Sequence, residues 1–152
     1  MEFAFRSTFL KDLDPKQLEL LVPLFESFRA SASTTIFEQG EPTSYLYLIL
    51  SGTVAIRYKP YDGPPITLTH LHAGDVFGWS AVVRNHAYTS SALTATGIEA
   101  LRVHRDDLKE FCQKNQELGY MVLEKLAENV SPRWKNAREQ IRNMFGDVLG
   151  QT

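Results

Sequence analysis

The chain has 152 residues, 43% of them hydrophobic, with 16 basic and 18 acidic side chains that leave a formal net charge of −2. This length fits one globular domain with an appendage, and the near-neutral charge excludes a general attraction to nucleic acid or anionic membranes. The only cysteine, Cys112, excludes an intramolecular disulfide, a zinc ribbon and a cysteine-ligated iron–sulfur cluster.

The N-terminal segment lacks the pattern of an export signal. Its sequence, MEFAFRSTFLKDLD, has no basic start followed by a sustained apolar run. The longest fully apolar run of the chain, from Tyr45 to Leu50, is far too short to cross a bilayer. We therefore expect a soluble, cytoplasmic protein without a membrane segment.

The first predicted element is a short helix in the sequence DPKQLELLVPLF. Asp14 can cap this helix, and Pro15 suits its first position. Leu18 and Leu21 share one face, so the helix has an apolar side to bury. Pro23 is expected to end it.

The middle of the chain consists of short β-rich runs separated by turn residues such as Ser51-Gly52 and Thr96-Gly97. No long helical pattern interrupts these runs. They predict an all-β sandwich, roll or barrel rather than a parallel sheet. The predicted strands are residues 28–33, 34–37, 45–50, 53–58, 65–72, 88–95 and 98–104.

After the last strand the apolar period becomes helical. Leu108, Phe111 and Cys112 define a short helix, on whose apolar side the cysteine is expected to be inert core packing. A longer helical tract runs from about Gln116 to Val148, with apolar residues at alternating spacings of four and three, as in a coiled-coil seam. The seam consists of Leu123, Ala127, Val130, Trp134, Ala137, Ile141, Met144 and Val148.

The apolar face of this long helix needs a partner. We expect two copies to pair along it as a homodimer, and the alternative is that the stripe folds back onto the β structure. Ser131-Pro132 could start a new helix, but the seam keeps its phase across the proline, which favours a kink. Residues 1–115 then form a β-roll domain with its N-terminal helix, and residues 116–152 form the dimerisation helix.

Two motifs stand within this order of elements: IFEQGEPTSYLYLILSGTVAI, from Ile36, and GDVFG, from Gly74. Together they resemble the cyclic-nucleotide-binding domain of the catabolite-activator (cAMP receptor protein/fumarate-nitrate regulator) superfamily, over residues 8–148. The resemblance implies a mainly β fold with flanking helices: a double-stranded β-helix of the jelly-roll or β-roll kind, a short cassette helix and a long C-terminal dimerisation helix. It fixes the ligand less firmly than the fold.

In that superfamily a phosphate-binding cassette reads Phe-Gly-Glu, then a short helix, then an arginine followed by small residues. The glutamate binds the ribose hydroxyl and the arginine binds the cyclic phosphate. Here Trp79 replaces the glutamate and Tyr88 the arginine, so cyclic-nucleotide affinity should fall at least about tenfold. The corresponding residues are Phe77, Gly78, Trp79, Ser80, Ala81, Tyr88, Thr89, Ser90 and Ser91.

The remainder of the cassette could still hold a small anion weakly. Backbone N–H groups at residues 78–81 and the hydroxyls of residues 89–91 would form an anion nest. Arg84 and His86 follow the short helix and are either substitute cations or solvated loop charges. Trp79 and Tyr88 alternatively close the vacated pocket as core aromatics.

A metal enzyme is the main rival from another class. His70 and His72 lie two apart on a predicted strand and share a face, as in a metal-binding cupin. Only Asp75, in a turn, and His86 and His104, at unassigned positions, could add ligands; the alternative is two histidines on a polar outer face. No Gly-x-Ser-x-Gly elbow or Gly-Lys-Ser/Thr phosphate loop is present. We expect neither a metal site nor catalysis.

DNA binding is the other rival, because the superfamily includes transcription factors with a helix-turn-helix domain after the long helix. We expect no such domain in this chain. Residues 131–152 carry four basic and two acidic side chains, which is more typical of a solvated helix face than of a phosphate track. Sequence-specific DNA binding by the chain is therefore not expected.

Together these patterns predict a non-enzymatic regulatory or sensor module without a cofactor. Its regulatory ligand would be a cyclic nucleotide or another small anion, bound weakly, and a homodimer would transmit the signal to an unknown protein partner. The rival within the same fold is a ligand-free dimerising scaffold whose pocket is filled by Trp79 and Tyr88.

Overall fold

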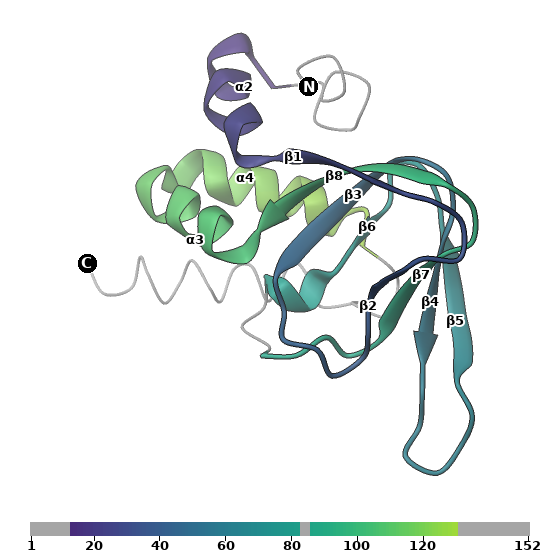
Figure 1. Ribbon diagram of the computed structural model, residues 1–152. Helices are drawn as coiled ribbons and strands as arrows, with labels where there is room; N and C mark the ends of the chain where they lie inside the picture. The colour runs from purple at the N-terminus through teal and green to yellow at the C-terminus, as the bar shows by residue number, and fades with distance from the viewer. Residues whose placement is uncertain (1–12, 83–85, 131–152) are drawn as a thin grey trace.

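The computed structural model describes residues 13–82 and 86–130 of the chain (Figure 1). Two four-stranded antiparallel sheets, in the orders β1-β8-β3-β6 and β2-β7-β4-β5, enclose a core and form a β-roll. The predicted mainly β fold with flanking helices is confirmed. The strands are β1 Glu26–Ala30, β2 Thr35–Phe37, β3 Tyr45–Ser51, β4 Val54–Tyr58, β5 Ile66–Leu71, β6 Val76–Phe77, β7 Ser91–Thr94 and β8 Ile98–His104.

Helix α2, Pro15–Leu21, begins with a capping box. The Asp14 side chain accepts a hydrogen bond from the backbone N–H of Gln17 at 2.8 Å, and the Gln17 side chain accepts one from the backbone N–H of Asp14 at 3.0 Å. A 3₁₀ turn, Val22–Leu24, follows and contains Pro23. The α-helix therefore ends before the proline, as the sequence predicts.

Strand β3 is apolar on both faces because it separates two cores. Leu46 and Leu48 face a helix-side core, built between the sheet β1-β8-β3-β6 and the helices. Tyr47 and Ile49 face a roll core, enclosed between the two sheets. Successive side chains of a strand point to opposite faces, so a strand buried on both sides has no polar position to alternate with.

Helices α3, Arg105–Lys114, and α4, Gln116–Ala127, form a hairpin that covers the helix-side core. Gly119 allows their close approach, since a Cβ there would lie 2.9 Å from the Cα of Cys112. Burial raises the pKa of the Cys112 thiol to about 12, which fits the predicted inert packing role. No helix in the described parts of the chain combines the length and the apolar composition that a membrane span requires.

The helical tract predicted from about Gln116 to Val148, with a kink favoured at Pro132, is interrupted before the proline, because α4 ends at Ala127. The carbonyl oxygen of Asn129 accepts a hydrogen bond from the N–H of Val76 at 3.0 Å, and Val130 forms a parallel bridge with Val76. The Asn129 carbonyl is thus bonded to β6, while the N–H groups of Asn129 and Val130 still bond to carbonyls three residues earlier. Pro132 and the seam residues Trp134, Ala137, Ile141, Met144 and Val148 lie outside the described residues.

The described part of the seam faces the molecule's own core. Leu123 and Ala127 are buried in the helix-side core, and Val130 packs against it. The alternative in which the stripe folds back onto the β structure therefore holds for these three residues.

Strand β6 is absent from the predicted strands. Its residues, Val76 and Phe77, stand in a motif dominated by turn glycines, which hides the strand in the sequence.

The two-sided burial of β3 predicts a large stability effect at Leu48. This side chain is 1% exposed, whereas Leu68 on β5 is 45% exposed. Leu48→Ala should lower the free energy of unfolding by about 2–5 kcal/mol, because it leaves a cavity in the helix-side core. Leu68→Ala should change it by less than about 0.5 kcal/mol. Urea unfolding of both variants measures the difference, and equal losses would contradict the assignment of β3 as a shared core strand.

Candidate functional site

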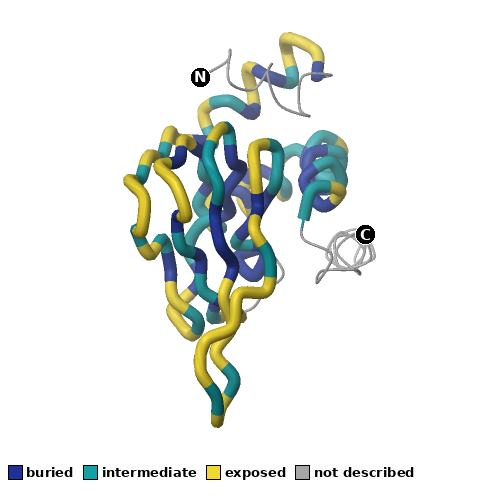
Figure 2. The backbone as a smooth tube through the Cα atoms, turned by 90° about the vertical axis from the view of Figure 1, so that its right-hand side faces the viewer, coloured by how far each residue is buried: buried dark blue, intermediate teal, exposed yellow. Residues whose placement is uncertain are grey.

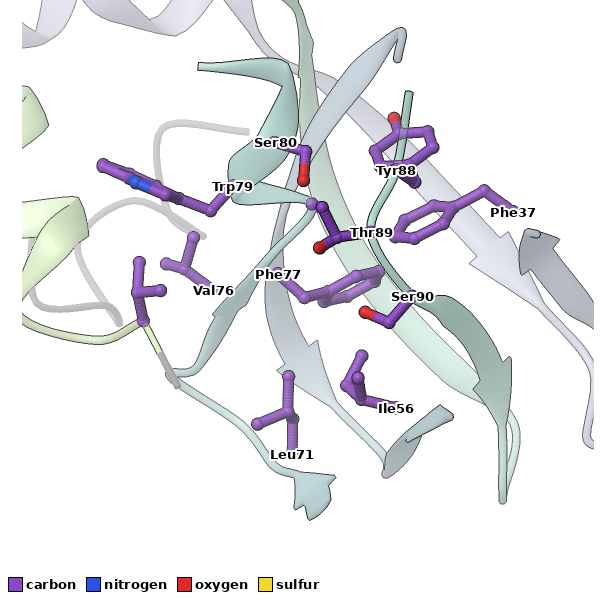
Figure 3. Close-up of a pocket in the computed structure, with 12 residues that line it drawn as sticks. Phe37, Ile56, Leu71, Val76, Phe77, Trp79, Ser80, Tyr88, Thr89 and Ser90 are labelled. Carbon is purple, nitrogen blue, oxygen red and sulfur yellow. The ribbon is translucent and has the colours of Figure 1, made fainter. Parts of the chain in front are cut away.

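The cassette residues surround a small cavity between β6 and the start of β7 (Figure 3). Its volume of about 30 Å³ is enough for a single water, whereas pockets for small organic ligands measure about 300–1,000 Å³. Among the described residues, no charged side chain lines it. The lining residues are Phe37, Ile56, Leu71, Val76, Phe77, Gly78, Trp79, Ser80, Tyr88, Thr89, Ser90 and Val130.

Tyr88 fills the position of the cassette arginine and is only 5% exposed. Its hydroxyl accepts hydrogen bonds from the backbone N–H groups of Ser44, at 3.0 Å, and Tyr45, at 2.9 Å. The same hydroxyl donates to the carbonyl oxygen of Tyr45 at 2.9 Å. The ring stacks on Phe37, with centroids 3.7 Å apart and planes 10° from parallel. Tyr88 thus closes one wall of the cavity (Figure 3).

Burial also raises the pKa of Tyr88, while the hydrogen bonds from the backbone at Ser44 and Tyr45 act in the opposite direction. The phenol therefore stays neutral near pH 7. A neutral hydroxyl with three backbone contacts cannot replace the guanidinium that binds a cyclic phosphate.

Trp79 fills the position of the cassette glutamate but does not face the cavity as a polar group. It is 1% exposed and belongs to the helix-side core. Figure 3 shows its ring directed away from Phe77 and Tyr88. Gly78 precedes it with φ +83°, and a Cβ at Gly78 would lie 2.7 Å from the carbonyl oxygen of Tyr45. The turn into the short helix therefore needs glycine and packs tightly on β3.

The short helix is the 3₁₀ turn η3, Trp79–Ala81, and it supplies fewer donors than the predicted nest requires. The N–H of Ala81 is already bonded to the carbonyl oxygen of Gly78 at 3.0 Å. Ser80 and Ser90 are buried at the cavity wall, and Thr89 is exposed at its edge. The structure brings Ser80, Thr89 and Ser90 together at the cavity, whereas the predicted nest used the hydroxyls of residues 89–91.

Ser91 and His86 lie away from the predicted nest. The hydroxyl oxygen of Ser91 accepts a hydrogen bond from the N–H of Gln39 at 2.8 Å and does not line the cavity, because strand alternation turns Ser91 away from Ser90. His86 is exposed and is not a lining residue. Arg84 lies outside the described residues.

The histidine pair lies on the outer surface. His70, on β5, and His72, just after it, are both exposed, and Nδ1 of His72 is 3.3 Å from the hydroxyl of Thr53. His104 instead caps α3, where its Nδ1 accepts from the N–H of Asp106 at 3.1 Å. Within residues 13–82 and 86–130, no three His, Cys, Asp or Glu side chains form a group that could hold a metal ion.

Sequence reasoning missed the residue that covers the cavity from the helix side. Val130 was assigned to the dimer seam, yet it lines the cavity next to its bridge partner Val76. The heptad spacing gave no signal for this role, because a contact between residues 76 and 130 depends on how the end of α4 meets β6.

A half-buried cation on β8 was also missed. The Arg102 guanidinium carbon lies 4.0 Å from the ring centre of Tyr45, and Nε donates to a Glu26 carboxylate oxygen at 2.6 Å. Arg102 is also hydrogen-bonded to the Tyr47 side chain, whose ring stacks on Phe77 at 4.7 Å between centroids. Its charge is thus already matched by Glu26.

A β-roll with a helical cassette between β6 and β7 defines a ligand-binding type of regulatory domain. The family model for the cyclic nucleotide-binding domain matches residues 27–115. The chain therefore belongs to the cyclic nucleotide-binding domain family.

Curated relatives are transcriptional regulators by name. A CRP-like cAMP-activated global transcriptional regulator of Mycobacterium tuberculosis is 29% identical over 150 residues, which cover 99% of this chain and 66% of the relative. The cAMP-activated global transcriptional regulator CRP of Haemophilus influenzae is 28% identical over 122 residues, covering 79% of this chain and 53% of that protein. The chain thus spans about half to two thirds of the length of these relatives.

Solved structures agree with the fold. A putative cyclic nucleotide-binding protein from Geobacter metallireducens is 25% identical with a TM-score of 0.68, covering 80% of this chain and 87% of that one. A cyclic nucleotide-binding domain from Methylobacillus flagellatus has a TM-score of 0.73 at 20% identity, covering 88% and 75% of the two chains. The second likeness shows the fold alone.

The bonding of Tyr88 predicts that its hydroxyl stabilises the fold. Tyr88→Phe should lower the free energy of unfolding by about 1–3 kcal/mol, because two N–H groups and a carbonyl of residues 44 and 45 lose their partner while the ring stack remains. Tyr61→Phe is the matched control, since Tyr61 is fully exposed. Urea unfolding measures the free energy of unfolding of both variants. Equal values would mean that the hydrogen bonds of the Tyr88 hydroxyl do not stabilise the fold.

The buried phenol of Tyr47 predicts a pH dependence. Burial raises its pKa to about 12, despite the opposing hydrogen bond from Arg102. Above pH about 10 the unfolded chain loses this proton first, so stability should fall between pH about 10 and 12, by roughly 2–3 kcal/mol. Tyr47→Phe should flatten the fall in urea unfolding measured across this range, and Tyr61→Phe should leave it intact. An unchanged slope in Tyr47→Phe would contradict the assignment.

Proposed function

We propose that this chain is a regulatory domain whose cyclic-nucleotide site has been closed, so that it acts as a ligand-independent dimerising module rather than as a nucleotide sensor. One observation carries the proposal: the cassette encloses about 30 Å³, and Tyr88 is bonded in place of the arginine. A cyclic nucleotide does not fit in this volume.

Opening the site would cost several kcal/mol, and few new contacts with a nucleotide would offset this cost. Tyr88 would lose three hydrogen bonds, at about 0.5–1.5 kcal/mol each, and a ring stack of similar size. The cassette positions of the arginine and the glutamate hold Tyr88 and Trp79, so neither can bind the phosphate or the ribose afterwards. The same volume argues against the small-anion sensor, because the hydroxyls of Ser80 and Ser90 border a space suited to one water.

The end of α4 supports a permanently closed state. In a sensor, the segment that covers the pocket must move when ligand enters. Here the Asn129 carbonyl is tied to β6 through Val76, and Val130 lines the cavity. The cover is therefore part of the folded core and needs no ligand to hold it.

Dimerisation is the output that the sequence pattern supports. Leu123 and Ala127 are used within the chain's own core, so the pairing surface belongs to the apolar positions after Val130. The boundary between the β-roll domain and the dimerisation segment then falls near residue 130 rather than at 115. The proposed module is non-enzymatic and cytoplasmic and does not itself read DNA sequence.

The closed site predicts no binding of cyclic nucleotides. Titration calorimetry with cyclic AMP and then cyclic GMP, to about 1 mM, should give no saturable heat, and neither nucleotide should raise the melting temperature. The M. tuberculosis regulator, whose name states activation by cAMP, is the positive control in the same buffer. Heat that saturates at low micromolar ligand would overturn the proposal and make the chain a nucleotide sensor.

The dimer proposal predicts a change of mass on truncation. At tens of micromolar, sedimentation equilibrium should give a dimer for the full chain and a folded monomer for a chain that ends at Val130. The truncation keeps every contact described for α4 and β6. A full-length monomer, or a truncated dimer, would show that residues 131–152 do not hold two copies together.

A further inference from the structure

A second hollow lies on the outer face of the sheet β2-β7-β4-β5, away from the cassette. It is a half-open groove of about 430 Å³. Its walls include Arg57 on β4, Lys59 just after β4, and Ser91 and Leu93 on β7. Unlike the cassette cavity, this groove is large enough for side chains of another molecule, and it carries two cations.

Hydrogen bonds fix one wall of the groove in advance. The Gln39 side chain donates to the backbone carbonyl of Lys59 at 3.1 Å and accepts from its N–H at 2.8 Å. The backbone N–H of Gln39 donates to the hydroxyl of Ser91 at 2.8 Å. The loop after β2 is thereby tied to β4 and β7, and a preformed wall lowers the ordering cost of binding.

Arg57 differs from the other described arginines. Arg29 pairs with Glu99 at 3.0 Å, and Arg102 and Arg105 also pair with carboxylates. Arg57 is exposed and makes no ion pair in the described structure. Among the described residues that line the groove, two are cations and one, Glu38, is a carboxylate. The net positive charge of the groove is therefore complementary to an acidic ligand.

The hairpin β4–β5 carries Arg57 on the groove side, and its register pairs Tyr58 with Ile66 on the opposite face. It projects from the body of the roll, and β5 is an edge strand that pairs only with β4 (Figures 1 and 2). Five large apolar side chains are exposed in the described residues, and four of them lie on this hairpin. They are Tyr58, Tyr61, Ile66 and Leu68. Such a concentration of exposed apolar groups on an open strand edge marks a protein-binding surface.

We propose that the groove and the hairpin together dock an extended segment of another protein that carries both carboxylates and apolar side chains. The carboxylates would pair with Arg57 and Lys59, and the apolar side chains would pack on Leu93 and, past the open edge of β5, on the exposed apolar side chains of the hairpin. A phosphate-sized anion would leave the apolar hairpin unused, and nucleic acid would find only two cations here. The inference does not depend on whether the cassette is closed.

Display selection followed by a direct binding measurement tests the proposal. The intact chain selects from a library of random peptides of about ten residues, and fluorescence anisotropy measures the enriched peptides. They should contain an excess of Asp and Glu together with apolar residues. Binding should weaken at least about tenfold in the double variant Arg57→Ala/Lys59→Ala and should weaken with added salt. The backbone bonds of Lys59 to Gln39 remain in this variant.

Arg29→Ala is the matched control, because Arg29 is an exposed arginine on the other sheet. It should bind the selected peptides like the unchanged chain. Circular dichroism melting shows whether the double variant is folded, and Arg57→Glu provides a second variant. No enrichment, or selected peptides that bind the folded double variant equally well, would overturn the proposal. Displacement of the peptide by pyrophosphate or by a single-stranded oligonucleotide at lower concentration would also overturn it, in favour of an anion or nucleic-acid site.

Discussion

The burial of strand β3 on both faces is the constraint on which the rest of the structure depends. Leu46 and Leu48 hold the helices against the sheet, and Tyr47 and Ile49 hold the two sheets together. A strand in this position contributes side chains to both cores, so one core cannot shift without moving the other. The helices α2, α3 and α4 are therefore part of the same packed unit as the roll.

The cassette is attached to the same strand. The Tyr88 hydroxyl is bonded to the backbone at the start of β3, and Gly78 lies against the Tyr45 carbonyl. Both ends of the cassette thus meet β3 within two residues of each other. Trp79 and Tyr88 stand at the positions that the resemblance assigns to the charged contacts, and here Trp79 enters one core and Tyr88 the other. The family fold is kept, and the loss of its ligand contacts is what we propose.

Two arginines of the described structure differ in whether a carboxylate neutralises them. Arg102 is half-buried, neutralised by Glu26 and covered by the Tyr45 ring. Arg57 stands on the outer face, where water solvates it and no carboxylate pairs with it. Positive charge available to a partner is thus found on the outer sheet face of the described structure, away from the cassette of the family.

Local patterns in the sequence determined much of this protein. Asp14 and Pro15 set the start of α2, apolar runs and turn residues set most strands, and the cassette motif showed that Trp79 and Tyr88 replace the charged residues. Only the tertiary structure decided that α4 ends at Ala127, that Val130 covers the cavity, and that Ser91 faces Gln39. Helical periodicity measures which residues share a face, but it does not show which surface that face meets. Contacts such as Val76 with Asn129 join residues far apart in the chain, and their free energy exists only once both cores are packed.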